Sequence, residues 1–284
     1  MSSPFDSGIT RRQALVGTAT FAGYALAVDK VLAQAIKTDT EGLAAGDFGV
    51  KIGSYEMPVY EARPASGGPH PAIIVISEVW GVHEYIRDCT RRFAKAGFYA
   101  VAPELFKREG GVAQLPNIQD ILKIVFAVPR KQLLGDIQAA TDWAKTRPGV
   151  AAGKFGVTGW CWGGSTTIQA AAAIPDMKAA VAWYGPPGRP YVDQPNPVTG
   201  FDVAKDIKIP FLGLYGEKDT SIKPEDAIKF GEMVKAGGNP NVEIIVYPGA
   251  GHAFHADYRP SYDAAAATDA WKRCTEHFTK FLRA

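Results

Sequence analysis

Short apolar runs alternate with longer segments of helical periodicity along most of the chain. The run 71–76 is continuously apolar, which is typical of a strand buried on both faces. Similar runs cover 98–101, 154–158, 179–183, 210–216 and 242–247, and helical patterns cover the segment up to about 97, 132–146, 224–235 and 264–282. This alternation predicts an α/β fold with a mainly parallel central sheet and helices on both of its faces.

Two segments depart from the alternation. The stretch 50–62 is predicted to form an antiparallel hairpin at the sheet edge, and the Pro- and Gly-rich stretch 186–202 is predicted to be a long loop that covers part of the site. The chain has 284 residues, of which 46% are hydrophobic, and can bury the core of one α/β domain. We expect one catalytic domain over residues 36–284.

The sequence Gly159-Trp160-Cys161-Trp162-Gly163 joins the predicted strand 154–158 to an Ala-rich helical segment. A nucleophile between two glycines on a strand–turn–helix connection is the pattern of a nucleophile elbow. The glycines let strand and helix approach each other, and the turn places Cys161 at a helix N-terminus, where the dipole favours a thiolate. We predict that Cys161 is a catalytic nucleophile rather than a buried structural cysteine.

Two further polar residues follow predicted strands. Asp219 comes shortly after 210–216, and His252 comes shortly after 242–247. Because the carboxyl ends of parallel strands meet at one edge of a sheet, these side chains can converge on Cys161 in the chain order of an α/β-hydrolase triad. We expect His252 to exchange a proton with the thiol and Asp219 to fix the His252 tautomer.

The loop after 71–76 adds a second set of candidates. In this architecture one backbone N–H after that strand and one after the nucleophile bind the oxyanion, and we assign Val79 and Trp162. Glu78 is expected to lie beside the thiol of Cys161. The alternative is that Glu78 caps the following helix.

These motifs resemble the dienelactone hydrolase (carboxymethylenebutenolidase) family of the α/β-hydrolase superfamily. The matching segments lie between about 49 and 281 and are Glu78-Val79-Trp80-Gly81-Val82, Ala102-Pro103-Glu104-Leu105, Gly159-Trp160-Cys161-Trp162-Gly163-Gly164, Trp183-Tyr184-Gly185, Gly216 with Asp219, and Gly251-His252-Ala253-Phe254. The resemblance implies a Cys161–His252–Asp219 triad, hydrolysis of a small lactone or activated carboxylic ester through a thioester, no cofactor, and a Glu78 side chain that interacts with the resting thiol. A general aryl or short-chain esterase is the closest alternative.

The chain also departs from that family, whose members hold a substrate carboxylate with two arginines. Ala256 stands four residues after His252, where one arginine is expected, and 117–120 contains none. This predicts a substrate other than a dianionic dienelactone. The aromatic residues Trp80, Trp160 and Tyr184 are instead predicted to bind an apolar or aromatic substrate.

The N-terminal segment has the features of a targeting sequence. Thr10-Arg11-Arg12-Gln13-Ala14-Leu15 resembles a twin-arginine motif, an apolar stretch follows over 16–28, and Leu32-Ala33-Gln34-Ala35 offers a small-x-small cleavage site. We predict a signal peptide over residues 1–35, a mature enzyme in the periplasm and no stable membrane association after its removal. The alternatives are a cytoplasmic tail or a retained membrane anchor.

The net charge bears on which molecules the protein can bind, and the cysteine content bears on disulfide formation. The net charge is +2 and no basic run is present, which argues against binding of nucleic acid. We expect a monomer whose binding partner is a small lactone or ester. Cys89 and Cys274 fall in helical patterns and are predicted to be buried in the core, with a disulfide between them as the alternative.

Two rival functions remain open from the sequence. The first is a zinc site formed by His252, His255 and Asp257, although glycines and no predicted helix surround it, so we expect no metal. The second is a protein that binds small molecules on the same scaffold without turnover. A complete triad argues against the second, because a binder has no need of it.

Overall fold

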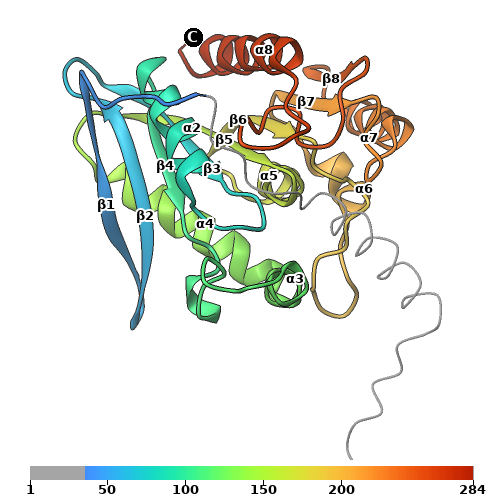
Figure 1. Ribbon diagram of the computed structural model, residues 1–284, viewed down its shortest axis with the longest axis horizontal. Coiled ribbons are helices and arrows are strands. Elements are labelled where there is room, and N and C mark those ends of the chain that lie inside the picture. The colour runs from blue at the N-terminus through green and yellow to red at the C-terminus, as the bar shows by residue number, and fades with distance from the viewer. Residues whose placement is uncertain (1–35, 284) are drawn as a thin grey trace, which may run out of the picture.

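The computed structural model describes residues 36–283. Its strands are β1 (Leu43–Ile52), β2 (Tyr55–Pro64), β3 (His70–Ile76), β4 (Tyr99–Pro103), β5 (Val150–Trp160), β6 (Met177–Trp183), β7 (Phe211–Gly216) and β8 (Val242–Tyr247). Within the described residues they form one eight-stranded sheet in the order β1-β2-β4-β3-β5-β6-β7-β8 (Figure 1). The pairs from β4–β3 to β7–β8 are parallel, and β1–β2 and β2–β4 are antiparallel. The mainly parallel sheet and the antiparallel edge hairpin are therefore confirmed.

Helices cover both faces of this sheet, as the alternation of runs predicted. They are α2 (Glu84–Lys95), α3 (Ile118–Ala127), α4 (Arg130–Lys145), α5 (Trp162–Ala173), α6 (Gly200–Val203), α7 (Pro224–Ala236) and α8 (Ala264–Leu282), with 3₁₀ turns η1 (Lys107–Glu109) and η2 (Ala204–Asp206). On one face α2 packs against α8, where the Phe93 ring lies 4.6 Å from Trp271 and 6.0 Å from Phe278. On the other face α4, α5, α6 and α7 contact one another in sequence order (Figure 1).

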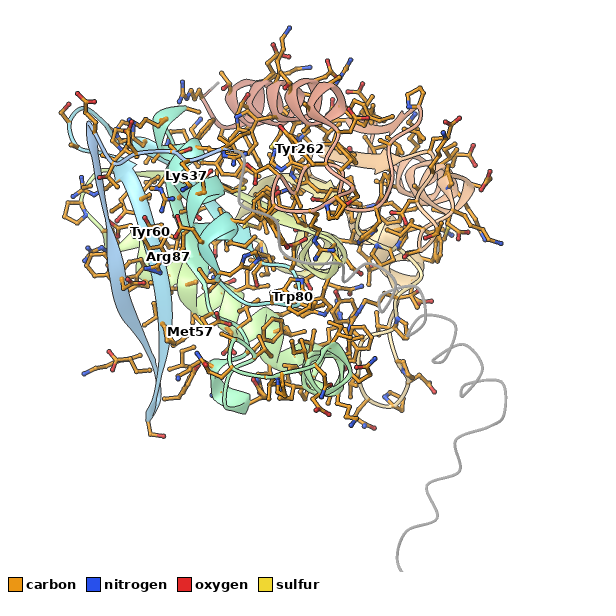
Figure 2. All side chains as sticks on the ribbon, viewed as in Figure 1. Lys37, Met57, Tyr60, Trp80, Arg87 and Tyr262 are labelled. Atoms are coloured by element: carbon orange, nitrogen blue, oxygen red, sulfur yellow. The ribbon has the colours of Figure 1, made fainter. Side chains whose placement is uncertain are left out.

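The edge hairpin is fastened to α2 by a few side chains. The guanidinium of Arg87 lies 4.1 Å from the centre of the Tyr60 ring on β2, and both residues are seen together in Figure 2. The same guanidinium forms an ion pair with Asp47 on β1. Met57 of β2 is fully buried, so the hairpin contributes to the core as well as to the edge.

The parallel strands end at one edge of the sheet and there present the candidate chemistry. β3 ends two residues before Glu78, β5 ends directly before Cys161, β7 ends three residues before Asp219, and β8 ends five residues before His252. Four segments far apart in the sequence are thus brought to the same edge, as the strand-end argument predicted.

Several other predictions can be assessed on the described residues. Cys89 and Cys274 are free and buried, so the core assignment is confirmed and the disulfide alternative is wrong. The stretch 186–202 is not wholly irregular, because Tyr191 bridges Val198 and Thr199 caps α6. The predicted signal peptide lies outside the described residues, and none of the helices described in 36–283 is long and apolar enough to cross a membrane.

Candidate functional site

Cys161 occupies a strained turn between β5 and α5. Its backbone has φ 56° and ψ −116°, a conformation rare for a residue with a side chain. The Cys161 N–H donates to the Trp183 carbonyl over 2.9 Å, and its carbonyl accepts from the Ser165 N–H over 3.1 Å. The turn is therefore fixed from both sides by the neighbouring strand β6 and the first turn of α5.

The two elbow glycines are required by close backbone approach, as predicted. A Cβ atom on Gly159 would lie 2.5 Å from the Gly163 carbonyl oxygen. A Cβ atom on Gly163 would lie 2.4 Å from the Ser77 carbonyl oxygen at the end of β3. Since real Cβ atoms do not approach backbone so closely, the elbow can form only with glycine at both positions.

The predicted acid and histidine contact each other. His252 Nδ1 and Asp219 Oδ2 are 2.7 Å apart, and the His252 side chain also hydrogen bonds to Cys161. The other Asp219 oxygen accepts from the N–H groups of Ser221 over 2.7 Å and Ile222 over 3.0 Å, so the carboxylate cannot rotate away. The structure thus brings together all three residues of the predicted triad.

Burial and charge oppose each other at His252. Burial lowers its pKa, but the negative charges of Asp219 and Cys161 and the hydrogen bonds to both raise it, and the net pKa is about 10. At neutral pH the imidazole therefore carries a proton on each nitrogen, one directed to Asp219 and one available to the sulfur.

The two predicted oxyanion donors have no backbone partner among the described residues. Neither the Val79 N–H nor the Trp162 N–H donates to another backbone group of the described residues, so both stay available to a ligand. The loop that carries Val79 is held by Glu104, whose carboxylate accepts from the Val82 N–H over 2.7 Å. Gly81 packs against the same carboxylate, where a Cβ atom would lie 2.6 Å from its oxygen.

Glu78 is fully buried, but it contacts groups other than the Cys161 thiol. Its Oε2 accepts from the Tyr258 hydroxyl over 2.5 Å and lies 3.4 Å from His83 Nε2, and its Oε1 lies 3.7 Å from Arg259 Nη2. Burial raises the Glu78 pKa, but Arg259, His83 and Tyr258 together lower it to about 2. The expected contact with the resting thiol is therefore absent from the contacts of the described residues.

The helix-capping alternative for Glu78 is wrong. The N-cap of α2 is His83, and no side chain caps that helix.

Arg259, Tyr258 and His83 are the residues of the site that the sequence analysis missed. Arg259 is buried and lies seven residues after His252. Burial lowers its pKa, but the negative charges of Glu78, Tyr258 and Cys161 raise it to a higher net value. The indication in the sequence was the pair Tyr258-Arg259 shortly after His252, where Arg259 lies three residues beyond Ala256, the position at which the family arginine is expected.

The three predicted aromatic residues lie in different surroundings. Trp160 is fully buried and stacks on Trp183 at 5.6 Å and on His255 at 5.9 Å, so it belongs to the core and these surroundings do not support a substrate contact. Tyr184 meets His252 edge to face at 5.3 Å. Trp80, labelled in Figure 2, is only partly buried and follows Val79 in the oxyanion loop.

The residues of the alternative zinc site are engaged elsewhere. His252 is bonded to Asp219, His255 Nδ1 lies 2.6 Å from the Tyr85 hydroxyl, and Asp257 is paired with Arg92 at 2.9 Å. Burial and the charge of Arg92 hold the His255 pKa well below its usual value, so this ring is neutral. Among residues 36–283 no cluster of His, Cys, Asp and Glu side chains has the arrangement of a metal site.

Known proteins resemble this chain over most of its length. Residues 57–282 match the model of the dienelactone hydrolase family. A "Putative carboxymethylenebutenolidase" of Methylorubrum extorquens is 45% identical over 274 residues, covering 95% of this chain and 93% of that protein. A "Probable 2-oxo-3-(5-oxofuran-2-ylidene)propanoate lactonase" of Bradyrhizobium sp is 32% identical over 215 residues, covering 75% of this chain and 84% of that protein.

A solved structure supports the same assignment. The crystal structure of a "Putative Dienelactone Hydrolase" from Klebsiella pneumoniae is 41% identical, has a TM-score of 0.79, and covers 84% of this chain and 99% of that one. The family match, the identity of the relatives and the shared fold agree with the resemblance carried by the elbow and the oxyanion loop. This chain belongs to the dienelactone hydrolase family.

Proposed function

We propose that this hydrolase cleaves a small lactone or activated carboxylic ester with Cys161 as the nucleophile. The observation that carries the proposal is the convergence of Cys161, His252 and Asp219 at the carboxyl edge of the sheet, beside two N–H groups without a backbone partner. A strained nucleophile, a histidine bonded to it and an acid that orients the histidine form the arrangement that nucleophilic acyl transfer needs.

The first half of the reaction forms a thioester. The Cys161 thiolate attacks the substrate carbonyl carbon, and the negative oxygen of the resulting tetrahedral intermediate accepts hydrogen bonds from the Val79 and Trp162 N–H groups. As the intermediate collapses, the carbon–oxygen bond of the ester breaks and His252 delivers its proton to the leaving alkoxide. Each oxyanion donor lowers the barrier by about 3 kcal/mol.

The second half returns the enzyme to its starting state. Neutral His252 removes a proton from water, and the hydroxide attacks the thioester carbon in the same oxyanion site. Collapse of this intermediate releases the carboxylic acid and the thiolate, and His252 is again protonated. Asp219 keeps the His252 ring in one orientation throughout, because its carboxylate is itself held by two backbone N–H groups.

Glu78 is assigned a positioning role in this scheme. Its negative charge is balanced by Arg259, and its carboxylate accepts a hydrogen bond from Tyr258, so the site contains no uncompensated carboxylate at this position. It also precedes Val79, so the contacts of its side chain help to orient the oxyanion N–H.

The substrate is assigned as a lactone or ester with an apolar or aromatic acyl portion. Trp80 carries this assignment, because it is partly exposed within the oxyanion loop. Tyr184 is fully buried, and its ring contributes an apolar wall behind His252. The name of the Bradyrhizobium relative, a lactonase, supports the lactone class. An aryl or short-chain esterase is the second candidate, and the same aromatic surroundings support it.

The test is hydrolysis of a panel of lactones and p-nitrophenyl esters by the native protein and by Cys161→Ala and Cys161→Ser. We expect turnover to be lost in Cys161→Ala, and intact mass after substrate addition to show an acyl adduct on Cys161 of the native protein. Equal rates in native protein and Cys161→Ala, or an adduct on another residue, would refute the mechanism. Tight binding without turnover would support the binding protein instead.

A further inference from the structure

The first described residue of the chain is bonded to the loop that carries the site. The Ile36 N–H donates to Asp257 Oδ2 over 3.0 Å. Asp257 lies five residues after His252 and two residues before Arg259, and its side chain is fully buried. The same Oδ2 accepts from Arg92 Nη2 over 2.9 Å, whereas Asp257 Oδ1 has no hydrogen-bond partner among the described residues.

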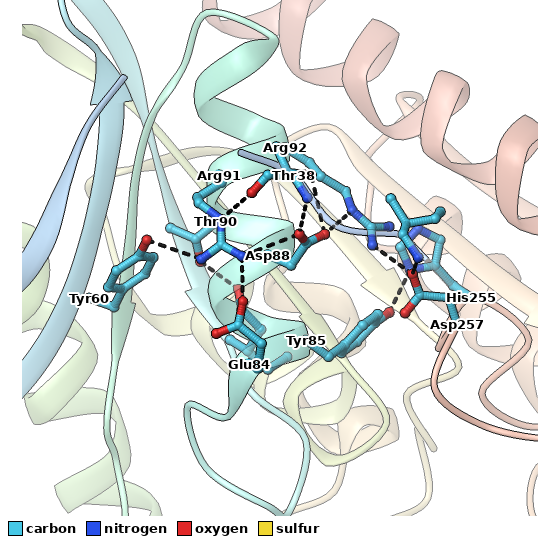
Figure 3. Close-up of polar contacts among 12 residues, drawn as sticks. Thr38, Tyr60, Glu84, Tyr85, Asp88, Thr90, Arg91, Arg92, His255 and Asp257 are labelled. Carbon is cyan, nitrogen blue, oxygen red and sulfur yellow. Dashed lines mark hydrogen bonds and ion pairs between the residues drawn. The ribbon is translucent and has the colours of Figure 1, made fainter. Parts of the chain in front are cut away.

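Charged side chains of α2 form a cluster with Asp257 (Figure 3). Its ion pairs join three carboxylates, those of Glu84, Asp88 and Asp257, to two guanidinium groups, those of Arg91 and Arg92. Asp257 shares Arg92 with Asp88, and its Oδ1 has no hydrogen-bond partner among the described residues. A buried carboxylate with an unsatisfied oxygen is costly. Burial accordingly raises the Asp257 pKa, although Arg92 and the Ile36 N–H lower it.

The following residues hold the Ile36 segment against α2. The Thr38 N–H donates to Asp88 Oδ1 over 2.6 Å, and Arg91 Nε donates to the Thr38 carbonyl over 2.8 Å. The nitrogen of Ile36 is thus held at the carboxylate by its own hydrogen bond and by the contacts of Thr38 two residues later. Directly before Ile36 stands the small-x-small sequence Ala33-Gln34-Ala35.

We propose that cleavage after Ala35 turns the Ile36 nitrogen into an α-ammonium group that forms a partly buried ion pair with Asp257 and fastens the His252–Arg259 loop. A signal peptidase supplies the catalysis and water is the co-reactant. The Ala35–Ile36 peptide bond breaks, the Ala35 carbonyl carbon becomes a carboxylate, and the Ile36 nitrogen leaves with two added protons. The ammonium keeps one bond to Oδ2, and its two further N–H groups are available to the bare Oδ1.

This maturation step places a positive charge beside Asp257, which shares its arginine with Asp88. An amide N–H offers one donor and no net charge, whereas an ammonium offers three donors and a full positive charge in a low-dielectric setting. The loop that it anchors contains His255, which bonds to Tyr85, and ends at Arg259, which faces Glu78. The uncut chain is therefore expected to be folded but less stable around this loop.

The test cuts the folded full chain in place. Residues 32–35 are replaced by the recognition sequence of an endoprotease that cuts after its last residue, so that cleavage leaves Ile36 as the first residue. In a matched chain the recognition sequence ends one residue earlier, and cleavage leaves Ala35 in front of Ile36. Melting temperature is measured before and after cleavage, together with the rate at which an amine-reactive reagent acylates the new N-terminus.

We expect cleavage before Ile36 to raise the melting temperature by about 5 °C and cleavage before Ala35 to leave it nearly unchanged. The Ile36 amine should be acylated at least about tenfold more slowly than the Ala35 amine, because only the free base reacts. With Asp257→Asn in both chains, the two differences should vanish. Equal melting temperatures and equal acylation rates in the two native chains overturn the ion pair, whether or not Asp257→Asn folds.

The processing step has its own readout. The full chain with its own first 35 residues is expressed in a bacterium with a twin-arginine export pathway, and the exported protein is analysed by intact mass. A mass that begins at Ile36 supports the proposal. Recovery of the chain uncut, or cut at another bond, overturns it, and neither outcome depends on the hydrolytic activity.

Discussion

Replacing Arg259 by methionine is the sharpest test of the polar network behind the elbow. The substitution keeps a long apolar side chain but removes the positive charge 3.7 Å from the fully buried Glu78 carboxylate. Of its partners among residues 36–283, Glu78 would then keep the Tyr258 hydroxyl and His83. A buried charge that loses its partner is strongly destabilising, whereas an intact pair contributes little.

The magnitude follows from the pKa of Glu78. Burial alone would raise that pKa, yet it is lowered from 4.5 to about 2, with Arg259 the largest of the lowering influences. This lowering corresponds to roughly 3 kcal/mol in the free energy of unfolding for all the partners of Glu78 together. Removing one partner of a buried ion pair costs about 3–5 kcal/mol. We expect Arg259→Met to cost about 3 kcal/mol, which is a fall of roughly 6–12 °C in the melting temperature of a domain of this size.

The assay compares melting temperatures of the native protein, Arg259→Met, Glu78→Gln and the double variant. If the cost comes from the uncompensated carboxylate, the double variant should recover most of the stability lost in Arg259→Met. The pH dependence gives an independent check. In the native protein the contribution of Glu78 is present above pH 4.5 and is lost as the pH falls toward 2.

The direction of the Glu78 pKa shift reverses when Arg259 is removed. Burial then raises the Glu78 pKa above 4.5, so the deficit of Arg259→Met should be largest at neutral pH and should shrink as the pH falls through the raised pKa. The reasoning is refuted if Arg259→Met costs less than about 1 kcal/mol, or if the losses of the two single variants simply add in the double variant.

Four further substitutions test the acid of the triad, the oxyanion loop and the glycines. Asp219→Asn should lower kcat/KM by about 10²–10⁴-fold. Because the His252 pKa is about 10, protonated His252 contributes fully to stability below pH 6.5 and not above pH 10, and Asp219→Asn should flatten this loss of stability. Unchanged kinetics and an unchanged pH–stability curve would contradict the role of the acid. Glu104→Ala releases the oxyanion loop and should lower kcat by about tenfold or more with little change in KM, whereas a pure KM effect in steady-state kinetics would contradict that role. Gly163→Ala should abolish soluble expression, while Gly135→Ala, in a helix with open space around it, should raise the unfolding free energy by about 0.5–1 kcal/mol in urea titrations; a folded Gly163→Ala would contradict the close-approach argument.

The triad could be predicted from the sequence because each of its parts is local. Cys161, Asp219 and His252 each follow an apolar run that is recognisable as a strand, and the topology of a parallel sheet brings strand ends together. The elbow glycines are also local, since their reason is the contact between a strand and the helix that directly follows it.

The surroundings of Glu78 could not be predicted in this way. Its partners Tyr258 and Arg259 lie 180 or more residues away, on a loop with no periodicity to reveal which side chains face inward. The place of Trp160 also depends on the third dimension. It stands next to the nucleophile in sequence, but it points into the layer of α8 and His255, because successive residues of a strand face opposite sides.

The different reactivities expected of the three cysteines allow active sites to be counted by thiol labelling. Burial raises the pKa of the Cys89 thiol to about 12 and that of Cys274 well above its usual value, so neither forms an appreciable amount of thiolate while the domain stays folded. A thiol reagent applied to the native protein should thus label one cysteine, Cys161, in each molecule whose active site is intact. The remaining two equivalents should appear only at the rate of global unfolding, so a single time course reports both the fraction of competent sites and the kinetic lifetime of the fold.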